Sequence, residues 1–179
     1  MDDIVKKALL KWPSVPACYG WLGLDSRGNW FMRDEQAQSQ GAFSGGTLLS
    51  KGSELKHEKL IEFIGRNYDV DDRGQWFFQN GPQRVYIELE LTPLIWRVER
   101  DFSVKDHVGR SAAVKRCVMD ELGYVYLDTT AGFGLIHTSD MNDVAHAIDQ
   151  GIWTPEAARR KDFELDYGYC KSPEKNQKK

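Results

Sequence analysis

Long apolar runs are missing from this 179-residue chain, and no stretch approaches the roughly 18 to 20 residues that a membrane-spanning helix needs. The first residues, Met1 to Lys7, lack the positive-then-apolar plan of a secretory signal peptide. Cysteine is scarce too: Cys18, Cys117 and Cys170 are far apart and form no Cys-x-x-Cys, which excludes a disulfide framework and a zinc ribbon. We expect a protein of the reducing cytoplasm with no membrane association.

The chain also has few prolines and no large excess of one charge. There are six prolines, and 24 Lys and Arg residues against 27 Asp and Glu residues leave a formal net charge of −3. With 41% hydrophobic and 28% charged residues, this composition excludes a disordered, collagen-like or coiled-coil chain. The acidic balance argues against a nucleic-acid partner, because phosphate backbones are bound by basic side chains.

The hydrophobic pattern predicts an α+β fold, mainly antiparallel β-sheet built from repeated hairpin units with packed helices. Alternation of apolar and polar residues predicts strands at 18–24, 29–33, 85–91, 94–99, 113–119, 124–128 and 133–138. Three- and four-residue apolar spacing and capping signals predict helices at 2–12, 53–64, 139–150 and 154–163. A long loop at 35–52 and a polar connection at 101–111 join these elements.

One short segment of the sequence recurs along the chain. Asp71–Phe77 repeats Asp25–Phe31 at an offset of 46 residues, with Asp, Arg, Gly, Trp and Phe in register, and Asp120–Tyr126 is a weaker third copy. Asp-x-x-Gly favours a tight turn, because Asp accepts from the turn amides and Gly takes a positive φ. The repeat indicates an internal duplication, and chance recurrence of turns in an antiparallel sheet is the alternative.

We therefore expect a single globular domain over residues 1–170. It would contain two repeated motifs at about 1–52 and 53–112, then a C-terminal meander and helices. Residues 171–179 are expected to form a disordered tail, because they are polar and lysine-rich.

One face of the predicted sheet combines aromatic rings with polar and charged groups. Successive strand residues point to opposite faces, so these side chains gather on one surface if all strands join one sheet. Rings supply contact area and polar groups orient a ligand. The candidate ligand-binding residues are Phe31, Arg33, Phe77, Tyr86, Glu88, Arg97, Tyr124, Tyr126 and His137. The alternative is that the helices at 53–64 and 140–150 cover this face and its aromatics are core.

Three classes of function stay open. The first is a module that binds a small molecule or a protein partner. The second is a small hydrolase or lyase-like enzyme whose acid and base come from Glu88, Glu90, Tyr126 and His137. The third is a dimerisation or docking protein that uses the aromatic face. The sequence assigns no catalytic residue and does not settle the oligomeric state.

No cofactor and no metal are expected. The glycine-rich segment 41–47 lacks the Lys that reaches the phosphates in a phosphate-binding loop. His137 and His146 could face one another, but no further ligands follow them at a recognised spacing.

Two Asp-x-x-Gly-x-Trp hairpins flank the helical segment Leu60–Ile64, and Leu91–Pro93 follows. In these features, residues 18–99 resemble a bacterial family of unknown function. The resemblance implies an α+β fold with repeated motifs and a small cytosolic bacterial protein linked to signalling. It implies no catalytic residues. This chain departs from the family pattern in its longer loop at 35–52 and in its C-terminal part, which has no match.

Overall fold

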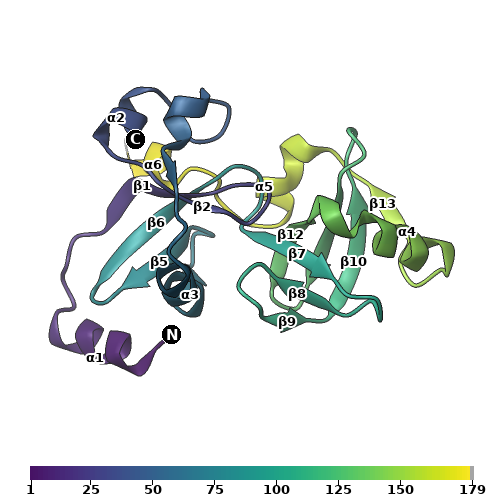
Figure 1. Ribbon diagram of the computed structural model, residues 1–179, viewed down its shortest axis with the longest axis horizontal. Coiled ribbons are helices and arrows are strands. Elements are labelled where there is room, and N and C mark those ends of the chain that lie inside the picture. The colour runs from purple at the N-terminus through teal and green to yellow at the C-terminus, as the bar shows by residue number, and fades with distance from the viewer. Residues whose placement is uncertain (178–179) are drawn as a thin grey trace. The chain divides into compact units, whose positions relative to one another are not determined.

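The computed structural model describes residues 1–177, and within it the chain forms two compact units. Unit 1 comprises Met1–Asp25, Asn29–Leu91 and the residues from Tyr169 on. Unit 2 comprises Ser26–Gly28 and Thr92–Gly168. Figure 1 labels the elements of both. The single globular domain over residues 1–170 stays a prediction.

Unit 1 is built on a six-stranded sheet with the order β3-β2-β1-β6-β5-β4. Its strands are β1 (Cys18–Leu24), β2 (Trp30–Met32), β3 (Ser53–Glu54), β4 (Tyr68–Val70), β5 (Trp76–Asn80) and β6 (Gln83–Leu89). Neighbouring strands are antiparallel except β1 and β6, which run parallel. Two three-stranded meanders therefore meet at one parallel pair.

The helices of unit 1 are α1 (Asp3–Lys11), α2 (Glu35–Ser39), the 3-10 helix η1 (Leu48–Lys51), α3 (Glu58–Arg66) and α6 (Pro173–Gln177). The helix predicted from residue 53 begins later, because residues 53–54 pair with β2 and His57 caps α3, its Nδ1 accepting from the Leu60 N–H at 3.3 Å. The predicted loop 35–52 contains α2 and η1. Asp34 and Thr47 cap them through their side chains.

The repeated tryptophans form the core of unit 1. Trp30 and Trp76 are buried, and the ring of Tyr68 packs against both, with centroid distances of 5.2 and 4.8 Å. Truncating a buried Trp to Ala typically costs about 3–5 kcal/mol. The Trp in each copy of the repeat therefore serves packing.

Unit 2 is built on a seven-stranded sheet with the order β13-β10-β11-β12-β7-β8-β9. Its strands are β7 (Leu94–Val98), β8 (Val104–Asp106), β9 (Ser111–Ala112), β10 (Val114–Met119), β11 (Val125–Thr129), β12 (Gly132–Ile136) and β13 (Pro155–Ala157). The pairs β12–β7 and β10–β13 are parallel and the others antiparallel. Without the edge strand β13, the order and directions repeat those of unit 1.

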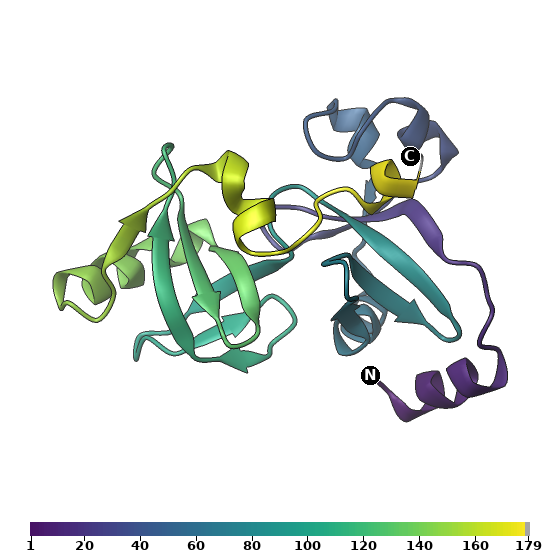
Figure 2. The same cartoon turned by 180° about the vertical axis from the view of Figure 1, so that it is seen from behind.

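Two predicted segments of unit 2 differ in the structure. The connection expected at 101–111 contains β8 and the start of β9. The helix expected at 154–163 begins instead as strand β13, whose Pro155 stands at the first position of an edge strand, where no ladder donor is needed. Figure 2 shows β13 beside β10. The helices of this unit are η2 (Thr138–Asp140), α4 (Met141–Asp149), η3 (Arg160–Asp162) and α5 (Phe163–Asp166).

The core of unit 2 contains Trp96, which is fully buried, and a cluster of three aromatic rings. Tyr126, Phe133 and Phe163 pack with centroid distances between 4.8 and 5.4 Å. The α+β class is confirmed. The expectation of mainly antiparallel sheet is only partly right, because both sheets are mixed and the strands do not join a single sheet.

The Asp-x-x-Gly sequences form one turn structure four times. In each, an Asp Oδ1 accepts from the N–H four residues on, at 2.8 to 2.9 Å, and the glycine has a φ between +72° and +86°. The four aspartates are Asp25, Asp71, Asp106 and Asp120. The copy at Asp106 was missed from the sequence because no aromatic residue follows its glycine. These aspartates are therefore structural.

Residues 173–177, inside the predicted tail, form α6. The carboxylate of Glu88 holds this segment, accepting from the Ser172 hydroxyl at 2.6 Å and the Glu174 N–H at 3.0 Å. The Lys171 carbonyl accepts from the Leu89 N–H at 2.8 Å. Figure 1 and Figure 2 both place α6 beside β6. The rest of the predicted tail, residues 178–179, lies outside the described residues.

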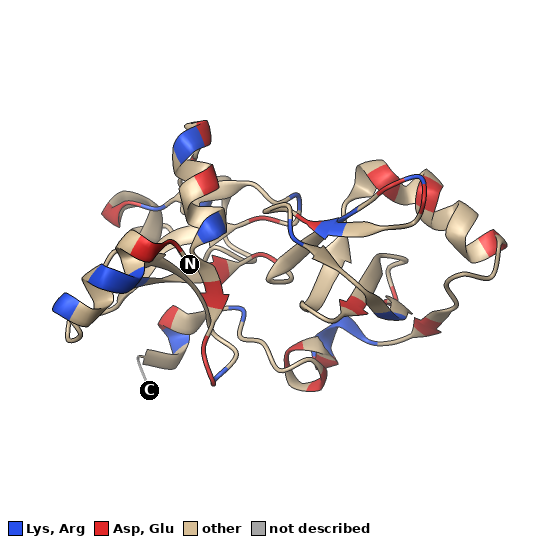
Figure 3. Ribbon diagram, turned by 90° about the horizontal axis from the view of Figure 1, so that it is seen from below, with Lys and Arg blue, Asp and Glu red and all other residues tan. Residues whose placement is uncertain are grey.

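None of the helices in residues 1–177 has the length and apolar content required to span a bilayer. Lys and Arg positions are interspersed with Asp and Glu positions along the ribbon (Figure 3).

Candidate functional site

The nine predicted site residues are divided between the two units. Unit 1 contributes Phe31, Arg33, Phe77, Tyr86 and Glu88, and unit 2 contributes Arg97, Tyr124, Tyr126 and His137. Most are buried. Those that the structure brings together around one pocket are Arg97 and His137.

Arg33 and Glu88 are used inside unit 1. Arg33 is only 1% exposed, and its guanidinium donates to the carbonyls of Gly20, Gly41 and Ser50 at 2.6 to 3.2 Å. Burial raises the pKa of the Glu88 carboxyl, while the hydrogen bonds from Ser172 and the Glu174 N–H lower it. These groups hold the unit together.

The aromatic candidates of unit 1 contact one another or polar partners. Phe77 and Tyr86 are buried and pack at a centroid distance of 5.8 Å. The Tyr86 hydroxyl donates to Asp71 at 2.9 Å, which supports that turn. Phe31, half-buried, packs against Phe43.

The two tyrosines of unit 2 differ in exposure. Tyr126 is fully buried and its hydroxyl donates to Asp120 at 2.8 Å; burial and this carboxylate raise its pKa far above the ordinary value. Tyr124 is 41% exposed, and the guanidinium of Arg160 lies 4.7 Å from its ring centroid. For the predicted acids and bases, Glu88 and Glu90 belong to unit 1 and Tyr126 and His137 to unit 2.

Three basic side chains cross the sheet of unit 2 on neighbouring strands. Arg97 of β7 stands directly opposite Lys105 of β8. His137 extends β12 by one residue and donates its N–H to the Trp96 carbonyl at 2.8 Å, which places it beside Arg97. Adjacent strands are about 4.8 Å apart, so the three span about 10 Å. We call His137, Arg97 and Lys105 the basic row.

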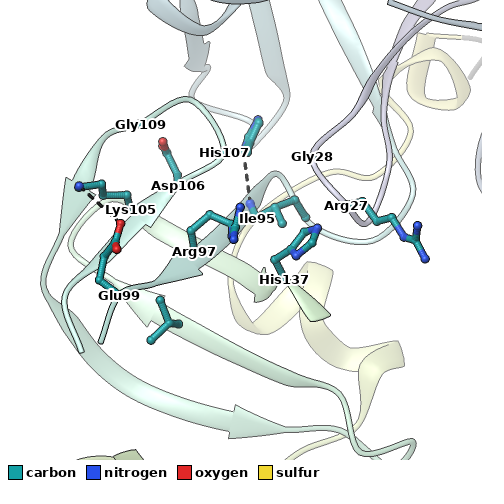
Figure 4. Close-up of a pocket in the computed structure, with 11 residues that line it drawn as sticks. Arg27, Gly28, Ile95, Arg97, Glu99, Lys105, Asp106, His107, Gly109 and His137 are labelled. Carbon is teal, nitrogen blue, oxygen red and sulfur yellow. Dashed lines mark hydrogen bonds and ion pairs between the residues drawn. The ribbon is translucent and has the colours of Figure 1, made fainter. Parts of the chain in front are cut away.

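The basic row lines a pocket of about 400 Å³. Figure 4 shows the Arg97 guanidinium next to the His137 imidazole, with Lys105 paired to Glu99. The other charged or titratable lining residues are Arg27, Glu99, Asp106 and His107. The pocket is therefore polar, with basic side chains from three neighbouring strands.

Asp140, at the junction of η2 and α4, holds Arg97 in place. Its carboxylate accepts from Arg97 Nε at 2.6 Å, from Arg97 Nη2 at 2.9 Å and from the Val98 N–H at 3.0 Å. Burial raises the pKa of Asp140, but these hydrogen bonds outweigh it and the net pKa lies below the usual value. Within residues 1–177, Arg97 Nη1 makes no further hydrogen bond. The guanidinium is therefore held in place while its Nη1 group can still donate to a ligand.

The acids that line the pocket are neutralised by neighbours. Asp106 has a fully buried side chain bound by its own turn and by Arg110 Nε at 2.7 Å. Glu99 faces Lys105 at 3.7 Å, with both side chains about half exposed. Such an exposed pair contributes roughly 0–1 kcal/mol, so Lys105 can exchange Glu99 for another anion at little cost.

Both histidines that line the pocket accept a hydrogen bond at Nδ1. The Nδ1 atom of His107 accepts from the Ile95 N–H at 3.3 Å, and that of His137 accepts from the Ser139 N–H at 3.2 Å. When the imidazole is neutral, its proton is then on Nε2. Burial lowers the pKa of His107 to about 4, so this ring is neutral near pH 7.

The sequence missed Lys105, His107 and Arg27 as pocket residues. Residues 101–111 lacked a visible alternation because β8 has three residues. The Asp106-x-x-Gly109 turn was the available signal for this hairpin. In residues 1–177 no three His, Cys, Asp or Glu side chains gather as a set that could ligate a metal ion.

A family model described as "Protein of unknown function (DUF2946)" matches residues 1–176. The crystal structure of a DUF1285 family protein from Silicibacter pomeroyi DSS-3 is 15% identical, with 80% of this chain and 83% of that chain covered and a TM-score of 0.47. A DUF1285 family protein from Shewanella baltica OS155 is 14% identical, with 70% and 91% covered and a TM-score of 0.46. No curated protein matches the chain.

Proposed function

The chain belongs to the family described as "Protein of unknown function (DUF2946)", and we propose that its unit 2 binds a small anionic molecule at the basic row. The family description names no activity. Membership of a family of unknown function agrees with the resemblance noted in the sequence. Nothing in the matches supports a link to signalling. A small-molecule partner and a cytoplasmic location are part of the proposal.

The observation that carries the proposal is the cross-strand pair of Arg97 and Lys105. Like charges directly opposite one another destabilise a sheet. Here the two cations are opposed on β7 and β8, with His137 next to them on β12. Asp140 offsets Arg97, but Lys105 has only a loose partner at 3.7 Å. An anion seated over the row removes this repulsion.

The pocket also suits a small molecule in size. A volume of about 400 Å³ lies within the roughly 300–1,000 Å³ of typical ligand sites. The fixed guanidinium supports binding, because Asp140 holds Arg97 before a ligand arrives and less side-chain entropy is lost on binding.

The test is isothermal titration of the whole protein with small anions at low ionic strength. Arg97→Gln should weaken binding about tenfold or more, the effect of one charge-assisted hydrogen bond. Arg116→Gln is the matched control, because Arg116 is also an ion-paired arginine of unit 2, 50% exposed against 52% for Arg97, and does not line the pocket. Equal binding by both variants, or no binding of any anion by the native protein, would contradict the proposal.

A further inference from the structure

We infer that the anion recognised at the basic row is the terminal phosphate of a small phosphate ester. This inference rests on the proposed function and names the chemical class of its ligand. It depends on how many donors the row offers and on how they are distributed.

A carboxylate is matched best by a two-pronged guanidinium. At this site one fork of Arg97 is already occupied, since Nε and Nη2 both donate to Asp140. The donors that remain are Nη1 and the second N–H of Nη2 on Arg97, Nε2 of His137 and Nζ of Lys105, and they come from three different strands. A carboxylate has two oxygens, so it cannot give each of the three side chains an oxygen of its own.

A phosphate monoester carries three terminal oxygens that point in different directions. Side chains from β12, β7 and β8 can each donate to one of them, once Lys105 leaves Glu99. Charge-assisted hydrogen bonds of this kind are about twice as strong as neutral ones. The pocket volume of about 400 Å³ leaves room for the organic part of the ester.

Glu99 competes with the ligand for Lys105. Its carboxylate lies 3.7 Å from Lys105 Nζ and lines the same pocket. Removing its charge frees Lys105 and removes a repulsive neighbour of the phosphate. Glu99→Gln should therefore tighten phosphate binding about threefold, an effect opposite in sign to that of damage to the fold.

The experiment is isothermal titration of the full chain with glycerol phosphate, inorganic phosphate, acetate, succinate and neutral glycerol. Glycerol phosphate is expected to bind at least about tenfold more tightly than succinate. His137→Asn keeps an acceptor for the Ser139 N–H but removes the Nε2 donor, and Lys105→Gln removes the ammonium group. Each should weaken glycerol phosphate binding about tenfold. Lys115→Gln, at an exposed position of β10, and Glu156→Gln, the partner of Arg116, are the controls.

The outcomes separate the inference from the proposed function. Acetate or succinate binding as tightly as glycerol phosphate, with dependence on Arg97, would overturn the phosphate assignment and leave anion binding in place. Weaker phosphate binding by Glu99→Gln would also overturn it. If none of the anions binds, the proposed function of anion binding is itself refuted.

Discussion

His107 should make the stability of the protein fall as the pH drops below neutrality. The residue is half-buried, with its Nε2 atom buried and its Nδ1 accepting from the Ile95 N–H, and burial of the ring lowers its pKa from 6.5 to about 4. The carboxylate of Asp106 favours the protonated form and the guanidinium of Arg110 opposes it, both less than burial does. The unfolded chain therefore binds a proton at this residue at a higher pH than the folded chain does.

The size of the effect follows from that difference. Between the two pKa values the unfolded state holds more protons, so lowering the pH favours unfolding. A difference of 2.5 units corresponds to roughly 3 kcal/mol over the full window from 6.5 to 4. Between about pH 7.5 and pH 5, the expected loss in the free energy of unfolding from this residue is about 2 kcal/mol.

The assay is urea unfolding followed by tryptophan fluorescence at several pH values across that range. His107→Asn retains an acceptor at the Nδ1 position and cannot titrate, so its free energy of unfolding should fall about 2 kcal/mol less than that of the native protein. The matched control is His146→Asn, at an exposed position of α4. Equal pH slopes for the native protein and His107→Asn would refute the argument that His107 is held neutral by burial.

Substitutions at three further positions test the hydrogen bonds and the turn geometry of unit 2. Asp140→Asn should lower the free energy of unfolding by about 1–3 kcal/mol at neutral pH. In urea titrations, the difference in the free energy of unfolding between this variant and the native protein should shrink as the pH falls below 3.8. The pKa of Asp140 is lower in the folded protein than in the unfolded chain, so the carboxylate stabilises the fold above pH 3.8 and this stabilisation is lost as the pH falls through the folded-state pKa. Tyr126→Phe removes the donor to Asp120 and should cost about 1–2 kcal/mol by urea unfolding, with anion binding unchanged; a loss of binding would contradict the assignment of the site. Gly123→Ala should cost about 1–2 kcal/mol from its φ of +82° alone, since open space surrounds the added Cβ, and Gly123→Asn should cost less in the same assay.

Part of the candidate site could be predicted from the sequence. Arg97 was a candidate because strand alternation places it among the polar residues of one face, and His137 was a candidate as a possible acid or base near that face. Lys105 was missed, since a strand of three residues has too little alternation to be recognised. Arg33, Glu88 and Tyr126 have the same residue types but are buried and bonded within their units, which alternation alone does not reveal.

Local chemistry was the part that the sequence determined by itself. The Asp-x-x-Gly turns at Asp25, Asp71 and Asp120 depend on hydrogen bonds that reach only four residues along the chain. The residues of each turn are therefore enough to predict it. The position of α4 similarly follows from spacing and capping over a few residues.

Only the tertiary structure decided how the strands are shared between two sheets. Each sheet is joined at its middle by a parallel pair, β1 with β6 and β7 with β12, and such partners are far apart in the chain. The same long-range pairing brings His137 beside Arg97, 40 residues earlier in the sequence. Strand alternation specifies which face of a sheet a side chain occupies but not which strand lies next to it. The basic row therefore depends on the pairing of β7 with β12 and with β8, which the alternation does not specify.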